Sequence, residues 1–134
     1  MNDSPRVLIV DDDPSIRSLL AEVVAREGAT PVLAVSGVEG MAALNGLGRR
    51  ISLVLLDLSM PEMDGFAFRD LQLEDAELAQ IPTVVLTGYR LSPDELSFMK
   101  PSAVLHKPAR LSAIREVVRR FAMPSSANVL TEGR

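Results

Sequence analysis

Short runs of apolar residues alternate with longer, more polar segments along the whole chain. The apolar runs lie near residues 7–10, 30–35, 52–56, 83–86 and 103–105. Each run has the length of a buried strand, and the segments between the runs are long enough to form helices. Alternating strands and helices are typical of a parallel sheet that is covered on both faces. We therefore expect an α/β fold, in which a doubly wound five-stranded parallel sheet carries five helices.

Two helices are expected before the third strand. In the first, Asp13 stands at the N-cap and Pro14 at the first helical position, which together form a strong start signal. The second helix lies near residues 37–47. We expect it to be the weaker one, because Gly40 and Gly46 interrupt it.

Three more helices are expected after the third strand. The third helix begins at Gly65-Phe66 and fades before Ile81-Pro82. The fourth spans only about Pro93–Met99, because Pro101 prevents its continuation. The fifth runs from about Leu111 to Phe121 and has one apolar face.

Length and composition indicate one domain. A chain of 134 residues with 47% hydrophobic residues is large enough to bury a full core. We expect that domain to span residues 1–123, and residues 124–134 to form a flexible C-terminal tail. Cysteine is absent, so the chain offers neither disulfide bonds nor thiolate chemistry.

The charge balance and the lack of long apolar runs exclude several classes of partner. A net charge of -4 and a pI of about 5.0 argue against direct binding to nucleic acid. No apolar run approaches the roughly 18 residues that are needed to cross a bilayer, and the N-terminus has no apolar signal segment. We expect a cytoplasmic protein without a membrane partner.

Polar side chains follow the predicted strands at the points where the strands end. Asp11 and Asp12 follow the first strand, Asp57 the third, Thr87 the fourth and Lys107 the fifth. In doubly wound sheets the ligand crevice lies outside the carboxyl ends of the strands. Doubly wound sheets of five strands commonly have the flavodoxin-like strand order 2-1-3-4-5. We assume this general order for the present chain. In this order the acids of the first strand and Asp57 are neighbours across the crevice.

Three carboxylates in one small site require compensation. At ~4 Å and an effective dielectric constant of ~20, each pair of like charges costs on the order of 4 kcal/mol. Either a proton or a cation must therefore bind, and a site with only oxygen ligands favours Mg²⁺. The carbonyl of Ser59, two residues past Asp57, is the most plausible further ligand.

The same crevice suits phosphoryl transfer. Aspartate carboxylates accept phosphoryl groups as acyl phosphates, and Asp57 is the best candidate because it is central. Lys107 supplies a positive charge, and the Thr87 hydroxyl can donate a hydrogen bond to a phosphoryl oxygen. Asp57, Thr87 and Lys107 are therefore the residues predicted to take part in phosphoryl transfer.

With these residues in this order, the chain resembles the response-regulator receiver domains of two-component signalling. The resemblance covers about residues 6–122, and each motif alone is weak, whereas all of them in order are highly specific. The matching segments are Val10-Asp11-Asp12, Asp57 with Met60-Pro61-x-Met63-Asp64-Gly65, Thr87-Gly88 and Lys107-Pro108.

The resemblance implies a function for each of these residues. Asp57 would take a phosphoryl group from a histidine of a sensor kinase or phosphotransfer protein. The groups that would hold Mg²⁺ are the side chains of Asp11, Asp12 and Asp57 and the carbonyl of Ser59. The chain would then be no enzyme beyond Mg²⁺-dependent self-phosphorylation and autodephosphorylation.

The resemblance also implies how the signal leaves the domain. Thr87 and Lys107 would sense the phosphoryl group and move the face of helix 4, strand 5 and helix 5. A downstream protein effector would bind this face, and a homodimer is possible. Receiver domains usually carry Tyr or Phe three residues before the lysine, where this chain has Val104. We further hypothesise that Tyr89, two residues after Thr87, screens the acyl phosphate from water.

Two alternatives stay open at the level of the sequence. Val104 and the short fourth helix favour a receiver-like docking module that signals without phosphorylation. The triplet Asp11-Asp12-Asp13 also fits the D-x-D pattern of haloacid-dehalogenase-type phosphatases. Only Glu116 follows Lys107 within the fold, however, so the further acidic pair that those enzymes need is missing.

Overall fold

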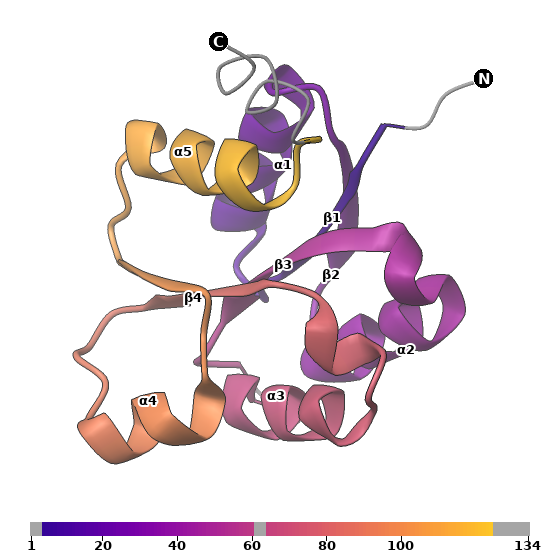
Figure 1. Ribbon diagram of the computed structural model, residues 1–134. Coiled ribbons are helices and arrows are strands. Elements are labelled where there is room, and N and C mark those ends of the chain that lie inside the picture. The colour runs from indigo at the N-terminus through magenta and orange to yellow at the C-terminus, as the bar shows by residue number, and fades with distance from the viewer. Residues whose placement is uncertain (1–3, 61–63, 125–134) are drawn as a thin grey trace, which may run out of the picture.

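The computed structural model describes residues 4–60 and 64–124. Within these residues five strands alternate with five helices, and two short 3₁₀ helices (η1 and η2) lie between them (Figure 1). The strands are β1 (Arg6–Val10), β2 (Thr30–Ala34), β3 (Ile51–Asp57), β4 (Thr83–Thr87) and β5 (Ala103–His106). The helices are α1 (Pro14–Arg26), α2 (Gly37–Leu47), η1 (Gly48–Arg50), α3 (Gly65–Glu74), η2 (Leu78–Gln80), α4 (Pro93–Met99) and α5 (Leu111–Phe121).

The strands form one parallel sheet in the order β2-β1-β3-β4-β5, which confirms the predicted fold. Val10 pairs with Ala34 of β2 on one side and with Leu56 of β3 on the other. This register brings the residues that follow Val10 and Leu56, Asp11 and Asp57, to the same edge of the sheet. The strand order therefore assembles the crevice that the sequence predicts.

The sheet separates two layers of helices and two apolar clusters. Helices α1 and α5 cover one face, and α2, α3 and α4 cover the other (Figure 1). Val7 and Ile9 of β1 pack towards α1 and α5, whereas Leu8 and Val10 pack into the cluster on the opposite side. All four side chains are fully buried, as expected for a parallel strand between two helical layers.

Helix α2 has the predicted bounds, and Gly40 has a packing role within it. The helix is continuous from Gly37 to Leu47. A Cβ atom at position 40 would lie 2.8 Å from the ring of Phe68 and 3.0 Å from a methyl group of Val10. Gly40 therefore allows α2 to pack closely against α3 and β1, which compensates for its low helical propensity.

The other helices agree with the predicted bounds, and the third ends before Ile81 as expected. Helix α3 ends at Glu74, and η2 fills part of the connection to β4. Helix α4 begins with a capping box, in which the side chains and backbone N–H groups of Ser92 and Glu95 bond reciprocally. Within the described residues no helix is both long and apolar enough to span a membrane. The predicted tail lies almost entirely outside those residues, so its boundary stays a prediction.

Candidate functional site

Three carboxylates meet at the carboxyl edge of the sheet. Asp11 and Asp12 follow β1, and Asp57 is the last residue of β3. One carboxylate oxygen from each residue lies within 4.8 Å of the other two. Asp11 and Asp57 are 1% and 3% exposed, and Asp12 is exposed. The cluster therefore has a buried floor and one side that opens to solvent.

Lys107 joins these carboxylates from the end of β5. Its Nζ lies 2.8 Å from Asp57 Oδ1 and 3.8 Å from Asp11 Oδ2. Its backbone N–H donates to the Thr87 carbonyl, and the bond to Pro108 is a cis peptide bond. Burial alone would lower the pKa of Lys107. The hydrogen bond to Asp57 and the charges of Asp11, Asp57 and Asp12 outweigh burial and raise it, so the amine is a cation at neutral pH.

Asp11 has one satisfied and one unsatisfied oxygen. Oδ1 accepts a hydrogen bond of 2.9 Å from the Asp13 backbone N–H. Oδ2 is buried and has no hydrogen-bond partner among the described residues. Burial raises the pKa of Asp11 to about 6, and the charges of Asp57 and Asp12 add to the rise, against the bond from Asp13 and the charge of Lys107. This carboxylate is the part of the site where positive charge is still lacking.

The donor set fits a magnesium ion. Three ionised carboxylates and one lysine give a formal charge of -3 + 1 = -2, which one divalent cation would neutralise. All the side-chain ligands are hard oxygen atoms, and the exposed side at Asp12 leaves room for the waters that Mg²⁺ retains. The Oδ2 of Asp11 is the observation that supports a cation here, because it is buried without a hydrogen-bond partner and its one ion-pair partner among the described residues, Lys107, is 3.8 Å away.

The remaining predicted residues lie beside this cluster. The Thr87 hydroxyl donates to the Tyr89 carbonyl at 3.0 Å and accepts from the Tyr89 N–H at 3.1 Å. It is therefore engaged with the β4–α4 loop, not with the carboxylates. Ser59 is exposed, and its N–H donates to Asp57 Oδ1 at 3.4 Å. Residues 61–63 of the predicted Met60–Gly65 motif lie outside the described residues.

Arg17 and Gly65 also support the site, although the sequence did not reveal these roles. Arg17 of α1 donates from Nη1 to the Asp11 carbonyl at 2.8 Å and so holds the β1–α1 loop. Gly65 lies against the end of β3, where a Cβ atom would be 2.7 Å from the Asp57 carbonyl oxygen and from Leu58 Cα. The motif that contains Gly65 indicated a turn, whereas nothing in the sequence distinguishes Arg17 from a surface arginine.

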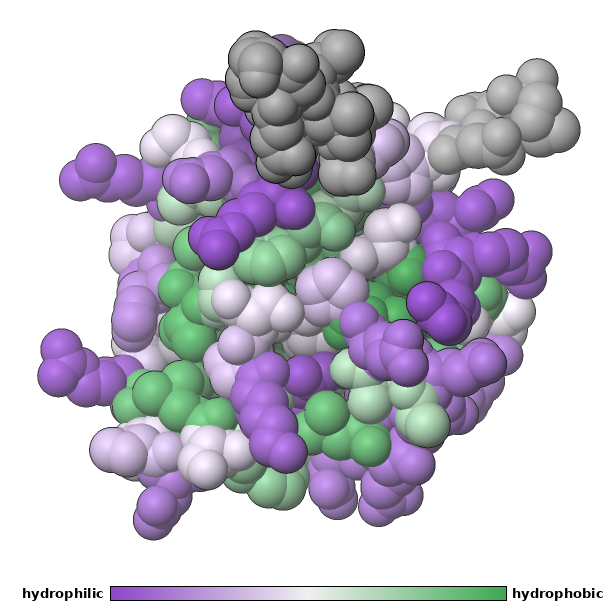
Figure 2. Space-filling model, in the orientation of Figure 1, coloured by the Kyte–Doolittle hydropathy of each residue, from purple (hydrophilic) through white to green (hydrophobic). Residues whose placement is uncertain are grey.

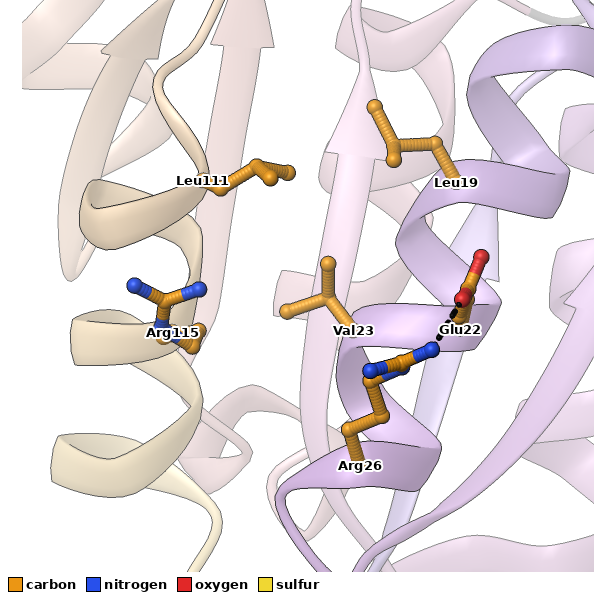
Figure 3. Close-up of a pocket in the computed structure, with 6 residues that line it drawn as sticks. All are labelled: Leu19, Glu22, Val23, Arg26, Leu111 and Arg115. Atoms are coloured by element: carbon orange, nitrogen blue, oxygen red, sulfur yellow. Dashed lines mark ion pairs between the residues drawn. The ribbon is translucent and has the colours of Figure 1, made fainter.

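Two of the hollows among the described residues lie away from the acids. One, between α1 and α5, is lined by Leu19, Glu22, Val23, Arg26, Leu111 and Arg115 (Figure 3). Leu19 and Leu111 point towards one another across it, and Glu22 pairs with Arg26 at 2.9 Å. None of the predicted site residues lines this hollow, so its shape does not bear on the chemistry at Asp57.

The second hollow lies beside β5, and Val104 is part of its wall. It is lined by Arg90, Leu91, Leu96, Val104 and His106. Hydrophobic surface lies over α4 (Figure 2), where Leu96 and Phe98 are 40% and 45% exposed. The face of α4 and β5 therefore carries apolar side chains, with Val104 at the position three residues before the lysine.

Comparisons with known proteins identify the family. Residues 7–119 match the family model of the response regulator receiver domain. The sporulation initiation phosphotransferase F of Bacillus subtilis is 32% identical over 130 residues, a match that covers 92% of this chain and 97% of that protein. The DNA-binding dual master transcriptional regulator RpaA of Synechocystis is 33% identical over 122 residues. That match covers 87% of this chain and only 50% of RpaA, and the chain spans a quarter of the transcriptional regulatory protein GlrR of Escherichia coli.

Solved structures give the same result. The chemotaxis protein CheY4 of Vibrio cholerae superposes with a TM-score of 0.79 at 26% identity, covering 88% of this chain and 98% of that chain. The signal receiver domain of a signal transduction histidine kinase from Syntrophus aciditrophicus superposes with a TM-score of 0.75 at 25% identity, covering 87% and 89%.

Proposed function

This chain belongs to the response regulator receiver family of two-component signalling, and we propose that Asp57 is its phosphoacceptor. The observation that carries the proposal is the position of Asp57. Its carboxylate is buried within the acidic cluster, and the Lys107 amine lies 2.8 Å from it. Receiver domains interact with histidine kinases or phosphotransfer proteins and with effectors. The donor would therefore be a phosphohistidine of such a protein.

In the proposed reaction an Asp57 carboxylate oxygen attacks the phosphorus atom of the phosphohistidine. The P–O bond to Asp57 forms while the P–N bond breaks, and the imidazole leaves with the electron pair of that bond. A magnesium ion held by Asp11, Asp12, Asp57 and the Ser59 carbonyl would neutralise charge on the transferred group. Lys107 orients Asp57 before transfer and stays close enough to pair with the phosphoryl oxygens afterwards.

The proposed relay begins at Thr87. A phosphoryl group on Asp57 would offer new acceptors to the Thr87 hydroxyl, which now donates to the Tyr89 carbonyl. Exchanging that partner would alter the β4–α4 loop and the face of α4, β5 and α5. A downstream protein effector would bind this face, where apolar side chains of α4 are exposed.

Family members are signalling proteins and not classical enzymes, so we propose that self-phosphorylation and autodephosphorylation are the only reactions of this chain. The docking module without phosphorylation is not favoured, because the acids and Lys107 are assembled around Asp57. The phosphatase alternative needs Asp13 as an acid. The side chain of Asp13 instead caps α1 by accepting bonds from the N–H groups of Ser15 and Ile16. The absence of nucleic-acid binding, the cytoplasmic location and a possible homodimer stay predictions.

The proposal is tested by intact-protein mass after incubation with a small phosphodonor and Mg²⁺. We expect one phosphoryl adduct on the wild type, no adduct on Asp57→Asn, and no adduct when the metal is chelated. Asp13→Asn is the matched control, because Asn also caps helices well and Asp13 is not part of the cluster. This variant should form the adduct like the wild type. A folded wild type that stays unlabelled would contradict the proposal and favour the docking module.

A further inference from the structure

Arg69 of α3 is a buried cation that the proposed chemistry does not use. Its side chain is 4% exposed, and no ion pair among the described residues includes it. Nη1 donates to Gln72 Oε1 at 2.9 Å and to Thr83 Oγ1 at 3.0 Å. Burial lowers the pKa of Arg69, yet a guanidinium stays protonated in proteins. A charge at this depth must be balanced by the dipoles around it.

The end of α4 supplies those dipoles. Arg69 Nε donates to the Met99 carbonyl at 2.7 Å, and Nη2 donates to the Lys100 carbonyl at 2.9 Å. Carbonyls at a helix C-terminus lack partners within the helix and carry its negative partial charge, which a cation stabilises. The last turn of α4 contains no basic residue of its own. The C-cap residue Lys100 is exposed, so Arg69 provides from α3 a buried positive charge at this end of the helix.

Further contacts hold the same end of α4. The Ser102 N–H donates to the Thr83 carbonyl at 2.8 Å, and the Thr83 N–H donates to Ser102 Oγ at 3.2 Å. Met99 is fully buried and is the one buried residue of the helix. The C-terminal end of α4 is therefore fixed both to α3, which lies beside it (Figure 1), and to β4.

The N-terminal end of α4 has weaker connections to the rest of the protein. The capping box of Ser92 and Glu95 lies within the helix and its cap, so it holds no other element. Of the loop before it, Leu91 is buried, whereas Arg90 is exposed and Tyr89 is 42% exposed. The hydrogen bonds between the Thr87 hydroxyl and the Tyr89 backbone connect this loop to the end of β4.

We propose that Arg69 is a positioning residue that anchors the C-terminal end of α4, so that phosphorylation displaces only the N-terminal end. The inference rests on the proposed function, because release of Tyr89 follows from a new partner for Thr87. Helix α4 then acts as a lever whose fixed point is the guanidinium of Arg69. An effector would sense the change at the loop of Tyr89 and the first turn of α4.

Amide hydrogen exchange with and without phosphorylation tests this asymmetry. In the wild type we expect phosphorylation to change exchange over residues 88–95 and to leave residues 97–102 unchanged. In unphosphorylated Arg69→Met we expect exchange over residues 97–102 to rise about tenfold, because the carbonyls of Met99 and Lys100 lose their donor. In the same variant the effect of phosphorylation should spread along the whole helix.

Two further variants make the test specific. Arg69→Lys keeps the charge but not the forked geometry, so it should restore part of the protection over residues 97–102. It also carries the comparison if Arg69→Met does not fold. Arg49→Met removes an exposed arginine of η1 and should leave both segments unchanged. Equal changes over residues 88–95 and 97–102 in the wild type would overturn the lever, and unchanged protection in both Arg69 variants would overturn the anchor.

The failure of this inference differs from the failure of the proposed function. A protein that forms the adduct on Asp57 but responds uniformly along α4 retains the function and loses the lever. A protein without an adduct loses the function and the lever with it. The anchor is then still judged on the unphosphorylated Arg69 variants.

Discussion

Tyr89 contributes to the candidate site through both its backbone and its side chain. The backbone N–H and carbonyl bond to the Thr87 hydroxyl, while the side chain is 42% exposed. Burial raises the pKa of Tyr89, and the charges of Glu95 and Asp64 act in the same direction, so its hydroxyl is protonated at neutral pH. A neutral ring in this position can restrict access of water to a phosphoryl group on Asp57.

We therefore expect Tyr89→Ala to lose the phosphoryl group faster than the wild type. The backbone contacts to Thr87 remain in this variant, so the change isolates the ring. The measurement is the decay of the adduct by intact-protein mass after removal of the phosphodonor. Tyr89→Phe keeps the ring and should decay at nearly the wild-type rate. Equal or slower decay in Tyr89→Ala would rule out the screening role.

The residue scale also separates what the sequence could predict from what it could not. The positions of Asp11, Asp57 and Lys107 were predictable because each lies at the carboxyl end of a strand, and parallel strands end at one edge. The hydrogen-bond partners were not predictable, because they depend on loop geometry. Thr87 illustrates this, since its hydroxyl bonds to the loop after β4. Arg69 illustrates it further, because no local pattern reveals that a helical arginine is buried against the end of another helix.

At the scale of the elements, α2 contains two glycines in different surroundings. A Cβ atom on Gly40 would meet the Phe68 ring at 2.8 Å and Val10 at 3.0 Å, whereas one on Gly46 would meet nothing within 4 Å. Gly40→Ala must therefore push α2 away from α3 and β1. We expect it to lower the free energy of unfolding by roughly 1–3 kcal/mol.

Gly46→Ala is the matched control and should have the opposite sign. It adds helical propensity without a clash, so we expect it to raise the free energy of unfolding by roughly 0.5–1 kcal/mol. Urea denaturation followed by far-UV circular dichroism measures both variants. Equal destabilisation by the two substitutions would contradict the packing argument.

Local sequence pattern and tertiary contacts also explain which features of the helices and strands could be predicted. Strands and capped helices were predictable from local pattern, because Asp13 and Pro14 start α1 and proline restricts α4. The bounds of α2 were predictable too, but the close packing at Gly40 was not, because it depends on Phe68 of another helix. Tertiary contact here outweighs local propensity.

At the scale of the whole molecule, the sheet brings together acids that are far apart in sequence, and their repulsion affects the stability of the entire fold. The effect on stability can be measured through Asp11, because burial and the neighbouring carboxylates raise its pKa from 3.8 to about 6. The folded state therefore binds this proton more tightly than the unfolded state. The resulting cost is fully present above pH 6 and is relieved as the pH falls from about 6 towards 4.

We accordingly expect the metal-free wild type to be less stable than Asp11→Asn at pH 7.5, by about 3 kcal/mol. This gap should narrow as the pH falls through 6, because the proton then replaces the missing positive charge. Thermal unfolding of both proteins in the presence of a chelator, from pH 7.5 to pH 4.5, gives the difference at each pH. A difference that does not vary with pH would show that Asp11 is ionised in the fold without cost.

Magnesium should stabilise the wild type at those pH values at which Asp11 has lost its proton. The ion competes with the proton for the Asp11 carboxylate, so its stabilising effect should be large at pH 7.5 and small at pH 5. At a concentration 100 times its dissociation constant, a bound ion stabilises a protein by about 2.7 kcal/mol. Asp13→Asn should respond to Mg²⁺ like the wild type, whereas Asp11→Asn should respond weakly, because it lacks a carboxylate of the cluster. A response of equal size in Asp11→Asn would place the ion outside the cluster of Asp11, Asp12 and Asp57.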